Sequence, residues 1–148
     1  VAYKSFSTTL QQKILDYLNG HGRLFVSGAY IGSDMTSDGE KTFLANALKV
    51  NYNGQNRDQI NTVVTGMGTQ MDVWRAINEQ HYAAVSADVL NAVGQGYCAM
   101  KYADGTSAAV AYDGTDYKTF TMGFPVECIK DVNTRRAVIK GIIAFILK

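Results

Sequence analysis

The stretch Arg23-Leu24-Phe25-Val26-Ser27-Gly28-Ala29 decides the expected fold, because it is a short apolar run that ends in small residues. A helical pattern precedes it, a second helical pattern follows it, and apolar and polar residues do not alternate within it. These features are typical of a central strand that is buried on both faces. We therefore predict an interior strand over residues 23–28, with a loop at its carboxyl end, where ligands commonly bind in such sheets.

The helices on either side of this strand carry recognisable start signals. Ser7 is a candidate N-cap for a helix over residues 7–19, whose apolar residues recur on one face. Ser37 and Glu40 have the spacing of a capping box, which predicts the start of a second helix. Residues 51–56 are polar and predict a turn-rich exit from that helix.

The middle of the chain is less regular. Residues 60–65 are rich in β-branched side chains and predict a strand, and residues 70–77 predict a second one. Residues 79–93 give no clear pattern. Within them, residues 86–90 fit a short extended piece or a single helical turn.

The last third predicts an antiparallel meander and a final helix. Three strand patterns, at residues 96–103, 107–112 and 117–124, are separated by Asp-Gly turns. An amphipathic helix follows over residues 133–147. Together with the helix–strand unit at the start, these elements predict a layered α/β/α domain with a mixed sheet of parallel strands and an antiparallel meander.

Composition bounds the class of protein. The 148 residues predict one domain, 1–148, and the chain begins at Val1 without an initiator Met, so we expect a fragment of a longer protein. A formal net charge of +1 gives no reason to expect nucleic acid as a partner, and no apolar run is long enough to cross a membrane. Abundant Tyr, Asn and Gly favour a secreted, periplasmic or cell-surface protein.

The two cysteines, Cys98 and Cys128, have no metal-ligand spacing with His21 or His81, so no metal site and no cofactor are expected. The two cysteines form either two buried thiols or one disulfide, and the sequence favours buried thiols.

Four segments carry a family resemblance. They read GRLFVSGAYIGSD, YADGTSAAVAY, TFTMGFPVECI and RRAVIKGIIAFIL. In this order the chain resembles the class I glutamine amidotransferase-like fold, in the divergent branch found in secreted bacterial xanthan lyase-like proteins. The resemblance implies further strand–helix units before the helix at residues 7–19. It therefore implies truncation at the N-terminus and a sheet edge that is exposed or covered by a partner segment.

The resemblance does not extend to catalytic residues. Active members carry a cysteine nucleophile at the turn after the central strand and a later His-x-Glu pair. Here that turn holds Ser27, Gly28 and Ala29, and no His-x-Glu occurs. The resemblance thus favours a non-catalytic accessory or interaction domain of a larger secreted bacterial protein that is related to polysaccharide. Its expected partners are other domains of that protein or a like subunit, with polysaccharide as a further candidate.

A hydrolase or lyase is the first alternative. It would use the crevice after the central strand, with Ser27, Glu127 and His81 as candidate catalytic residues. Ser33 and Asp34 in the same loop are candidate ligand-binding residues. A structural role is favoured over the chemical one for three of them: close packing for Ser27, a helix-terminus or loop hydrogen bond or an ion pair with Arg135 or Arg136 for Glu127, and capping or turn formation for Asp34.

A carbohydrate-binding module is the second alternative. Trp74, the only tryptophan, could stack on sugar rings together with several tyrosines. Those tyrosines are Tyr82, Tyr97, Tyr112 and Tyr117. Aromatic residues on strands more often belong to the core or to the sheet surface, so this interpretation also competes with a structural one.

Overall fold

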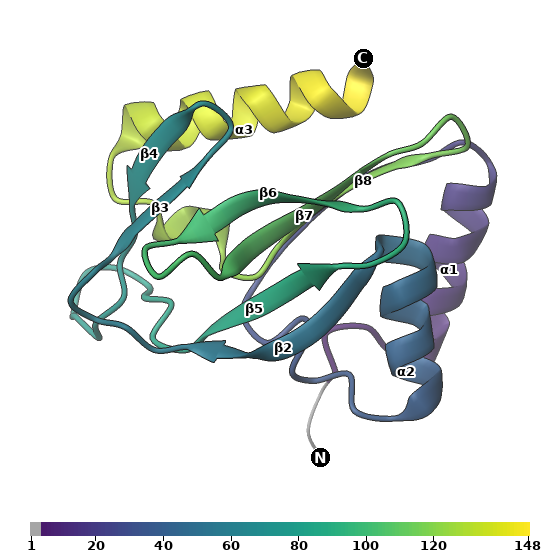
Figure 1. Cartoon of the computed structure of the whole chain (residues 1–148), viewed down its shortest axis with the longest axis horizontal. Helices are drawn as coiled ribbons and strands as arrows, with labels where there is room; N and C mark the ends of the chain where they lie inside the picture. The colour runs from purple at the N-terminus through teal and green to yellow at the C-terminus, as the bar shows by residue number, and fades with distance from the viewer. Residues whose placement is uncertain (1–3) are drawn as a thin grey trace.

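The structure is a computed structural model that describes residues 4–148. These residues form eight strands, three α-helices and two short helical turns (Figure 1). In chain order the elements are α1 (Thr8–Asn19), β1 (Arg23–Ser27), α2 (Asp38–Phe43), the π-helical turn η1 (Leu44–Leu48), β2 (Val50–Asn56), β3 (Val63–Gly66), β4 (Thr69–Asp72), β5 (Ala87–Ala92), β6 (Tyr97–Tyr102), β7 (Ser107–Asp113), β8 (Lys118–Met122), the 3-10 turn η2 (Val126–Cys128) and α3 (Val132–Leu147).

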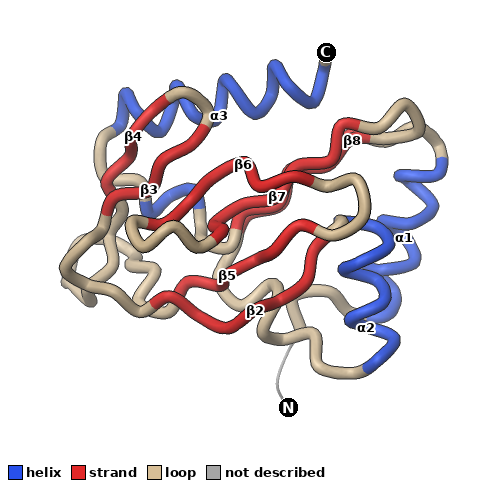
Figure 2. Tube along the Cα trace, viewed as in Figure 1, coloured by secondary structure: helices blue, strands red, loops and turns tan. Residues whose placement is uncertain are grey.

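Most strand pairs are antiparallel. Six strands form one sheet in the order β1-β8-β7-β6-β3-β4, and β2 pairs with β5 in a separate two-stranded sheet (Figure 2). Among the strands of residues 4–148, only β1 and β8 pair in parallel. The predicted layered α/β/α architecture is therefore wrong. Its parallel strands would each need a crossover helix, whereas tight turns join β3 to β4, β6 to β7 and β7 to β8 and impose antiparallel pairing. The result is a curled, mostly antiparallel sheet with few helices.

The strand at residues 23–28 exists, but it is not interior. β1 lies at one end of the six-stranded order, and its residues Leu24 to Ser27 are only half-buried. Phe25 packs toward the core beneath α3, whereas Leu24 and Val26 pack toward the core beneath α1 and α2. An apolar run without alternation therefore indicates a strand whose two faces are covered. It does not indicate whether other strands pair with its two edges.

Two apolar cores hold the fold together. One lies between the sheet and α3, and includes Phe120, Met122 and Ile142. The other lies between the sheet and the pair α1 and α2, and includes Leu18 and Leu48. Figure 1 shows this division, with α3 at the top and α1 and α2 together at the right. Burying each such side chain stabilises the fold by about 1.5–3 kcal/mol.

Both predicted helix starts are confirmed. The Ser7 hydroxyl accepts a hydrogen bond of 3.1 Å from the backbone N–H of Leu10. Ser37 and Glu40 form the reciprocal capping box at the start of α2. The second helix then widens into η1 and ends at Lys49, whose positive φ of 61° turns the chain into β2.

The prediction of a turn-rich exit at residues 51–56 is wrong, because this segment is most of β2. The polar residues in the middle of β2, Asn51 and Asn53, are exposed, and β2 pairs only with β5. The unassigned segment contains β5, which is extended and largely buried. The strand in the structure is shorter than the one predicted at residues 70–77, since β4 ends at Asp72. The meander of β6, β7 and β8 and the final helix lie where the sequence places them.

The two cysteines are free in the structure. Cys98 is exposed on β6, and Cys128 is buried in η2. Burial raises the pKa of the Cys128 thiol to about 11. Across residues 4–148 no helix is long and apolar enough to span a membrane, and no group of three metal-ligating side chains gathers there.

Candidate functional site

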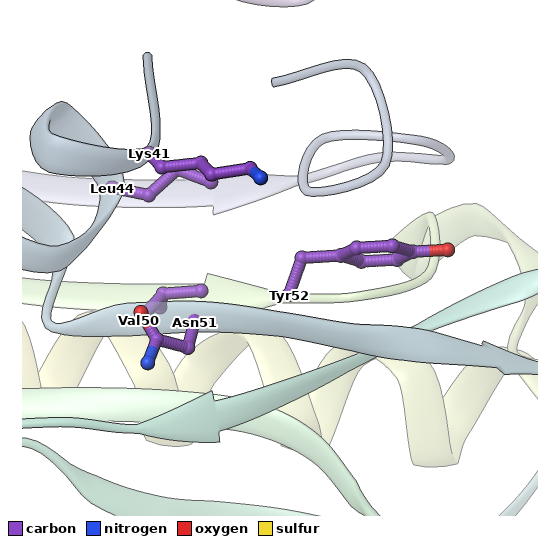
Figure 3. Close-up of a pocket in the computed structure, with 5 residues that line it drawn as sticks. All are labelled: Lys41, Leu44, Val50, Asn51 and Tyr52. Atoms are coloured by element: carbon purple, nitrogen blue, oxygen red, sulfur yellow. The ribbon is translucent and has the colours of Figure 1, made fainter. Parts of the chain in front are cut away.

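A hollow of about 300 Å³ lies between α2, η1 and β2. Lys41 and Leu44 form one wall, and Val50, Asn51 and Tyr52 form the other (Figure 3). Leu44 and Val50 are buried and make an apolar floor, whereas Lys41, Asn51 and Tyr52 are exposed at the opening. The hollow thus combines an apolar base with two exposed side chains, those of Lys41 and Tyr52, that can contact a ligand.

The turn from η1 into β2 builds this hollow. Lys49, which follows η1, donates a hydrogen bond of 2.8 Å to the carbonyl oxygen of Asn46. Its ammonium group lies 4.9 Å from the centre of the Tyr112 ring. Lys49 is therefore held against the protein, and Lys41 is the lysine that remains beside the opening.

A close backbone approach supports the Tyr52 wall. A Cβ atom at Gly32 would lie 3.1 Å from Cδ1 of Tyr52 and 2.8 Å from Cδ2 of Leu90. Only glycine lets the loop after β1 pass this close to β2 and β5. The position of the Tyr52 ring is therefore coupled to the path of that loop.

A buried carboxylate fixes the loop in this position. Oδ2 of Asp88, on β5, accepts hydrogen bonds from the backbone N–H groups of Gly32 at 2.8 Å and Ser33 at 3.1 Å. Oδ1 accepts a bond of 3.3 Å from the Gln55 side chain. Asp88 is fully buried, and burial raises the pKa of its carboxyl group. Sequence reasoning missed Asp88, although an acidic residue inside the apolar run of residues 87–90 is itself a signal.

The hollow is suited to binding rather than to hydrolysis. Its five lining residues include no carboxylate and no histidine, so it holds neither the acid–base pair of a glycosidase nor the base of a serine hydrolase. The exposed Tyr52 ring offers a flat apolar surface with a polar tip. Lys41 supplies hydrogen-bond donors on the same side of β2, whereas the Asn51 side chain points to the opposite face of the strand (Figure 3).

The candidate nucleophile Ser27 has a structural partner. Its Oγ accepts a hydrogen bond of 3.3 Å from the backbone N–H of Val126, which ties the end of β1 to η2. The structure thereby brings Ser27 and the exposed Glu127 to the same end of the sheet. Within residues 4–148 no hydrogen bond joins Ser27 to His81. The catalytic roles of Ser27, Glu127 and His81 stay predictions.

His81 lies against Trp74 instead. The two rings stack with centroids 4.8 Å apart and planes inclined by 8°. The Lys130 ammonium lies 4.6 Å from the centre of the indole ring. One face of the expected sugar-stacking platform is therefore already covered by the imidazole ring.

The other predicted ligand residues, Ser33 and Asp34, take part in contacts that hold the chain together. The Asp34 carboxylate accepts hydrogen bonds from the backbone N–H of Ser5 at 3.2 Å and from its hydroxyl at 3.0 Å. Asp34 thus anchors the segment before α1, while the backbone of Ser33 binds Asp88. Their roles in ligand binding stay predictions.

The predicted tyrosines divide into two groups. Tyr112 and Tyr117 are buried and pack edge-to-face with centroids 4.9 Å apart, so they belong to the core. Tyr82 and Tyr97 are exposed. Tyr52, which lines the hollow, was not among the aromatic residues singled out, because its segment was interpreted as a turn.

Three solved structures share this fold. An exo-β-1,4-mannosidase from Opitutaceae bacterium strain TAV5 aligns with a TM-score of 0.64 and 8% identity over 95% of this chain. The β-galactosidase of the psychrophilic Marinomonas ef1 aligns with a TM-score of 0.61 and 15% identity over 97% of the chain. That of Bacillus circulans sp. alkalophilus aligns with a TM-score of 0.61 and 11% identity over 93%.

The aligned chain corresponds to 23%, 19% and 20% of the length of these three proteins. No family model matches the sequence, and no curated protein sequence matches it. The expected resemblance to the amidotransferase-like fold and its xanthan lyase-like branch is wrong, because the structures that align are glycosidases and the sheet is mostly antiparallel. The chain has the fold of a small part of these larger glycosidases.

Proposed function

We propose that this chain is a carbohydrate-binding domain of a larger polysaccharide-degrading enzyme, and that it binds glycan at the hollow beside Tyr52. The observation that carries the proposal is the composition of the hollow: an exposed aromatic ring and an ammonium group over an apolar floor. The fold shared with about a fifth of each of three glycosidases supports it.

The chemistry of recognition follows from the lining residues. A sugar ring has an apolar C–H face that packs on an aromatic ring, and hydroxyl groups at its rim that need hydrogen-bond partners. The Tyr52 ring meets the first requirement, and the Lys41 ammonium group meets the second. With one aromatic ring, the site is expected to bind a single sugar with a Kd on the order of 1 mM.

This function needs no catalytic group in the chain, which agrees with the lack of carboxylates among the lining residues. Polysaccharide degradation outside the cytoplasm fits the predicted location, which stays a prediction. The enzyme that would carry the domain supplies the reaction, and the domain holds the polymer near it.

Affinity electrophoresis of the 148-residue chain in gels that contain soluble mannan or galactan tests the proposal. We expect at least one of the two polymers to retard the chain. Tyr52→Ala should weaken the retardation about fivefold, because an aromatic contact contributes about 0.5–1.5 kcal/mol.

Tyr97→Ala is the matched control. Tyr97 on β6 is 47% exposed, compared with 39% for Tyr52, and it lies outside the hollow. This variant should migrate like the unchanged chain. No retardation by either polymer, or an equal loss in both variants, would overturn the proposal.

A further inference from the structure

β1 leaves one of its edges without a paired strand among residues 4–148. The Tyr17 hydroxyl accepts a hydrogen bond from the backbone N–H of Arg23 and donates one to its carbonyl oxygen, both at 3.0 Å. Tyr17 therefore marks the outer edge. In a strand, the N–H and C=O of one residue point to the same edge, and the edge alternates from residue to residue. Phe25 and Ser27 thus also direct their backbone groups outward, whereas Leu24 and Val26 direct theirs to β8.

An apolar stripe of α3 flanks this edge on one face of the sheet. Ile142 is fully buried against the sheet, and a Cβ at Gly141 would lie 3.5 Å from Cε of Met67, in the β3–β4 hairpin. That hairpin is at the far end of the sheet from β1. Because successive helix residues are about 100° apart, Ile143 and Leu147 lie on the opposite side of α3, toward β1. They are 47% and 73% exposed.

The end of α3 is fixed beside β1. The Arg23 guanidinium donates a hydrogen bond of 3.0 Å to the carbonyl oxygen of Ile146. The stripe formed by Ile143 and Leu147 is therefore held close to the open edge.

α1 flanks the same edge on the other face. Tyr17 reaches the edge through its hydroxyl, and Leu10 lies seven residues earlier, on the same side of the helix. Both side chains are exposed. The outward backbone groups of Phe25 and Ser27 thus lie between two exposed apolar stripes, which is the environment of a strand buried on both faces.

We propose that the outer edge of β1 receives one more β-strand, apolar on both faces and parallel to β1, supplied by a longer polypeptide in which this domain is embedded. The lengths of the three glycosidases support this occupant, because the chain corresponds to only 23%, 19% and 20% of them. The connection also supports it. α1 enters β1 through the short turn at residues 20–22, so a strand that precedes α1 forms a strand–helix–strand crossover and lies parallel to β1.

Amide hydrogen exchange tests the proposal, measured on the 148-residue chain and on the full natural polypeptide that contains it. In the isolated chain, the Phe25 and Ser27 amides should exchange fast and those of Leu24 and Val26 slowly. In the full polypeptide, exchange at Phe25 and Ser27 should slow about a hundredfold or more.

Three results would overturn the proposal. Fast exchange at Phe25 and Ser27 in both proteins would show that nothing pairs with the edge. Slow exchange in an isolated chain of dimer mass would assign the edge to a second copy. Slow exchange in an isolated monomer would assign it to the chain's own residues.

A pair of variants in the full polypeptide tests whether the added strand lies between the two apolar stripes. Ile143→Lys should restore fast exchange at Phe25 and Ser27 and leave Leu24 and Val26 slow, because a charge beside the added strand disfavours its burial. Ile60→Lys changes a nearly fully exposed residue in the loop before β3 and should leave all four rates unchanged. Equal exchange rates in the two variants would contradict a strand buried between the two apolar stripes.

Discussion

The Asp88 carboxylate accepts a hydrogen bond of 2.8 Å from the backbone N–H of Gly32, joining β5 to the loop after β1. Asp88 is fully buried, and among the described residues no cation forms a salt bridge with it. Backbone N–H groups and one side-chain amide therefore take the place of a positively charged partner. The same contact holds the loop whose Gly32 lies beside the Tyr52 ring.

Asp88→Ala should destabilise the protein strongly. It leaves the N–H groups of Gly32 and Ser33 buried without an acceptor, at about 1–3 kcal/mol for each group. Urea unfolding followed by circular dichroism measures this loss. Asp88→Asn keeps an oxygen acceptor and should retain most of the stability, so equal losses in both variants would contradict the role given to the hydrogen bonds.

The stability of the chain should carry a pH dependence that comes from Asp88. Burial raises the pKa of its carboxyl group above the ordinary value of 3.8, so the folded state binds the proton more tightly than the unfolded state. The contribution of Asp88 is then most favourable below pH 3.8 and declines as the pH rises through the raised pKa. The free energy of unfolding of Asp88→Asn, measured against pH, should lack this decline. Parallel curves for the two proteins would contradict it.

Gly32→Ala should weaken both the fold and carbohydrate binding. The added Cβ would lie 2.8 Å from Leu90 and 3.1 Å from Tyr52, and such overpacking costs about 1–3 kcal/mol. Displacement of the Tyr52 ring should also reduce retardation in the polysaccharide gels. Gly39→Ala is the control, because nothing lies within 4 Å of its Cβ and it sits in α2. It should stabilise the chain by about 0.5–1 kcal/mol.

Arg75→Lys should be a disruptive change despite conserving the charge. The buried Arg75 guanidinium donates hydrogen bonds of 2.8 Å to the Ala84 carbonyl oxygen and to Oδ1 of Asn56. A lysine ammonium cannot reproduce this planar fork. We expect a loss of about 2–4 kcal/mol in the free energy of unfolding. Arg57→Lys, at an exposed site next to Asn56, should stay within about 0.5 kcal/mol of the original.

Local signals in the sequence predicted local structure well. Ser7 and the pair Ser37 and Glu40 start helices because side-chain oxygens satisfy N–H groups a few residues away, which is chemistry that a short window contains. The Asp-Gly turns likewise located the meander, since glycine at position 105 adopts a positive φ of 87°.

Features that depend on distant partners were not predictable in this way. The middle residues of β2 are mostly polar and exposed, so the segment resembles a loop until β5 is known to pair with it. The edge position of β1 depends on the order of strands, which its own apolar residues do not encode. The hollow could not be predicted from the sequence for the same reason. It forms because η1 and the left-handed backbone conformation of Lys49 bring Lys41 and Tyr52 together.

The contrast between the two thiols makes this chain convenient to label. Cys98 is accessible on β6, whereas Cys128 is enclosed and its raised pKa of about 11 keeps it protonated at neutral pH. A maleimide dye should therefore attach once per molecule, at a known position, without any engineered cysteine. Paired with a second fluorophore on another protein, this dye would report by energy transfer how the domain sits relative to that protein.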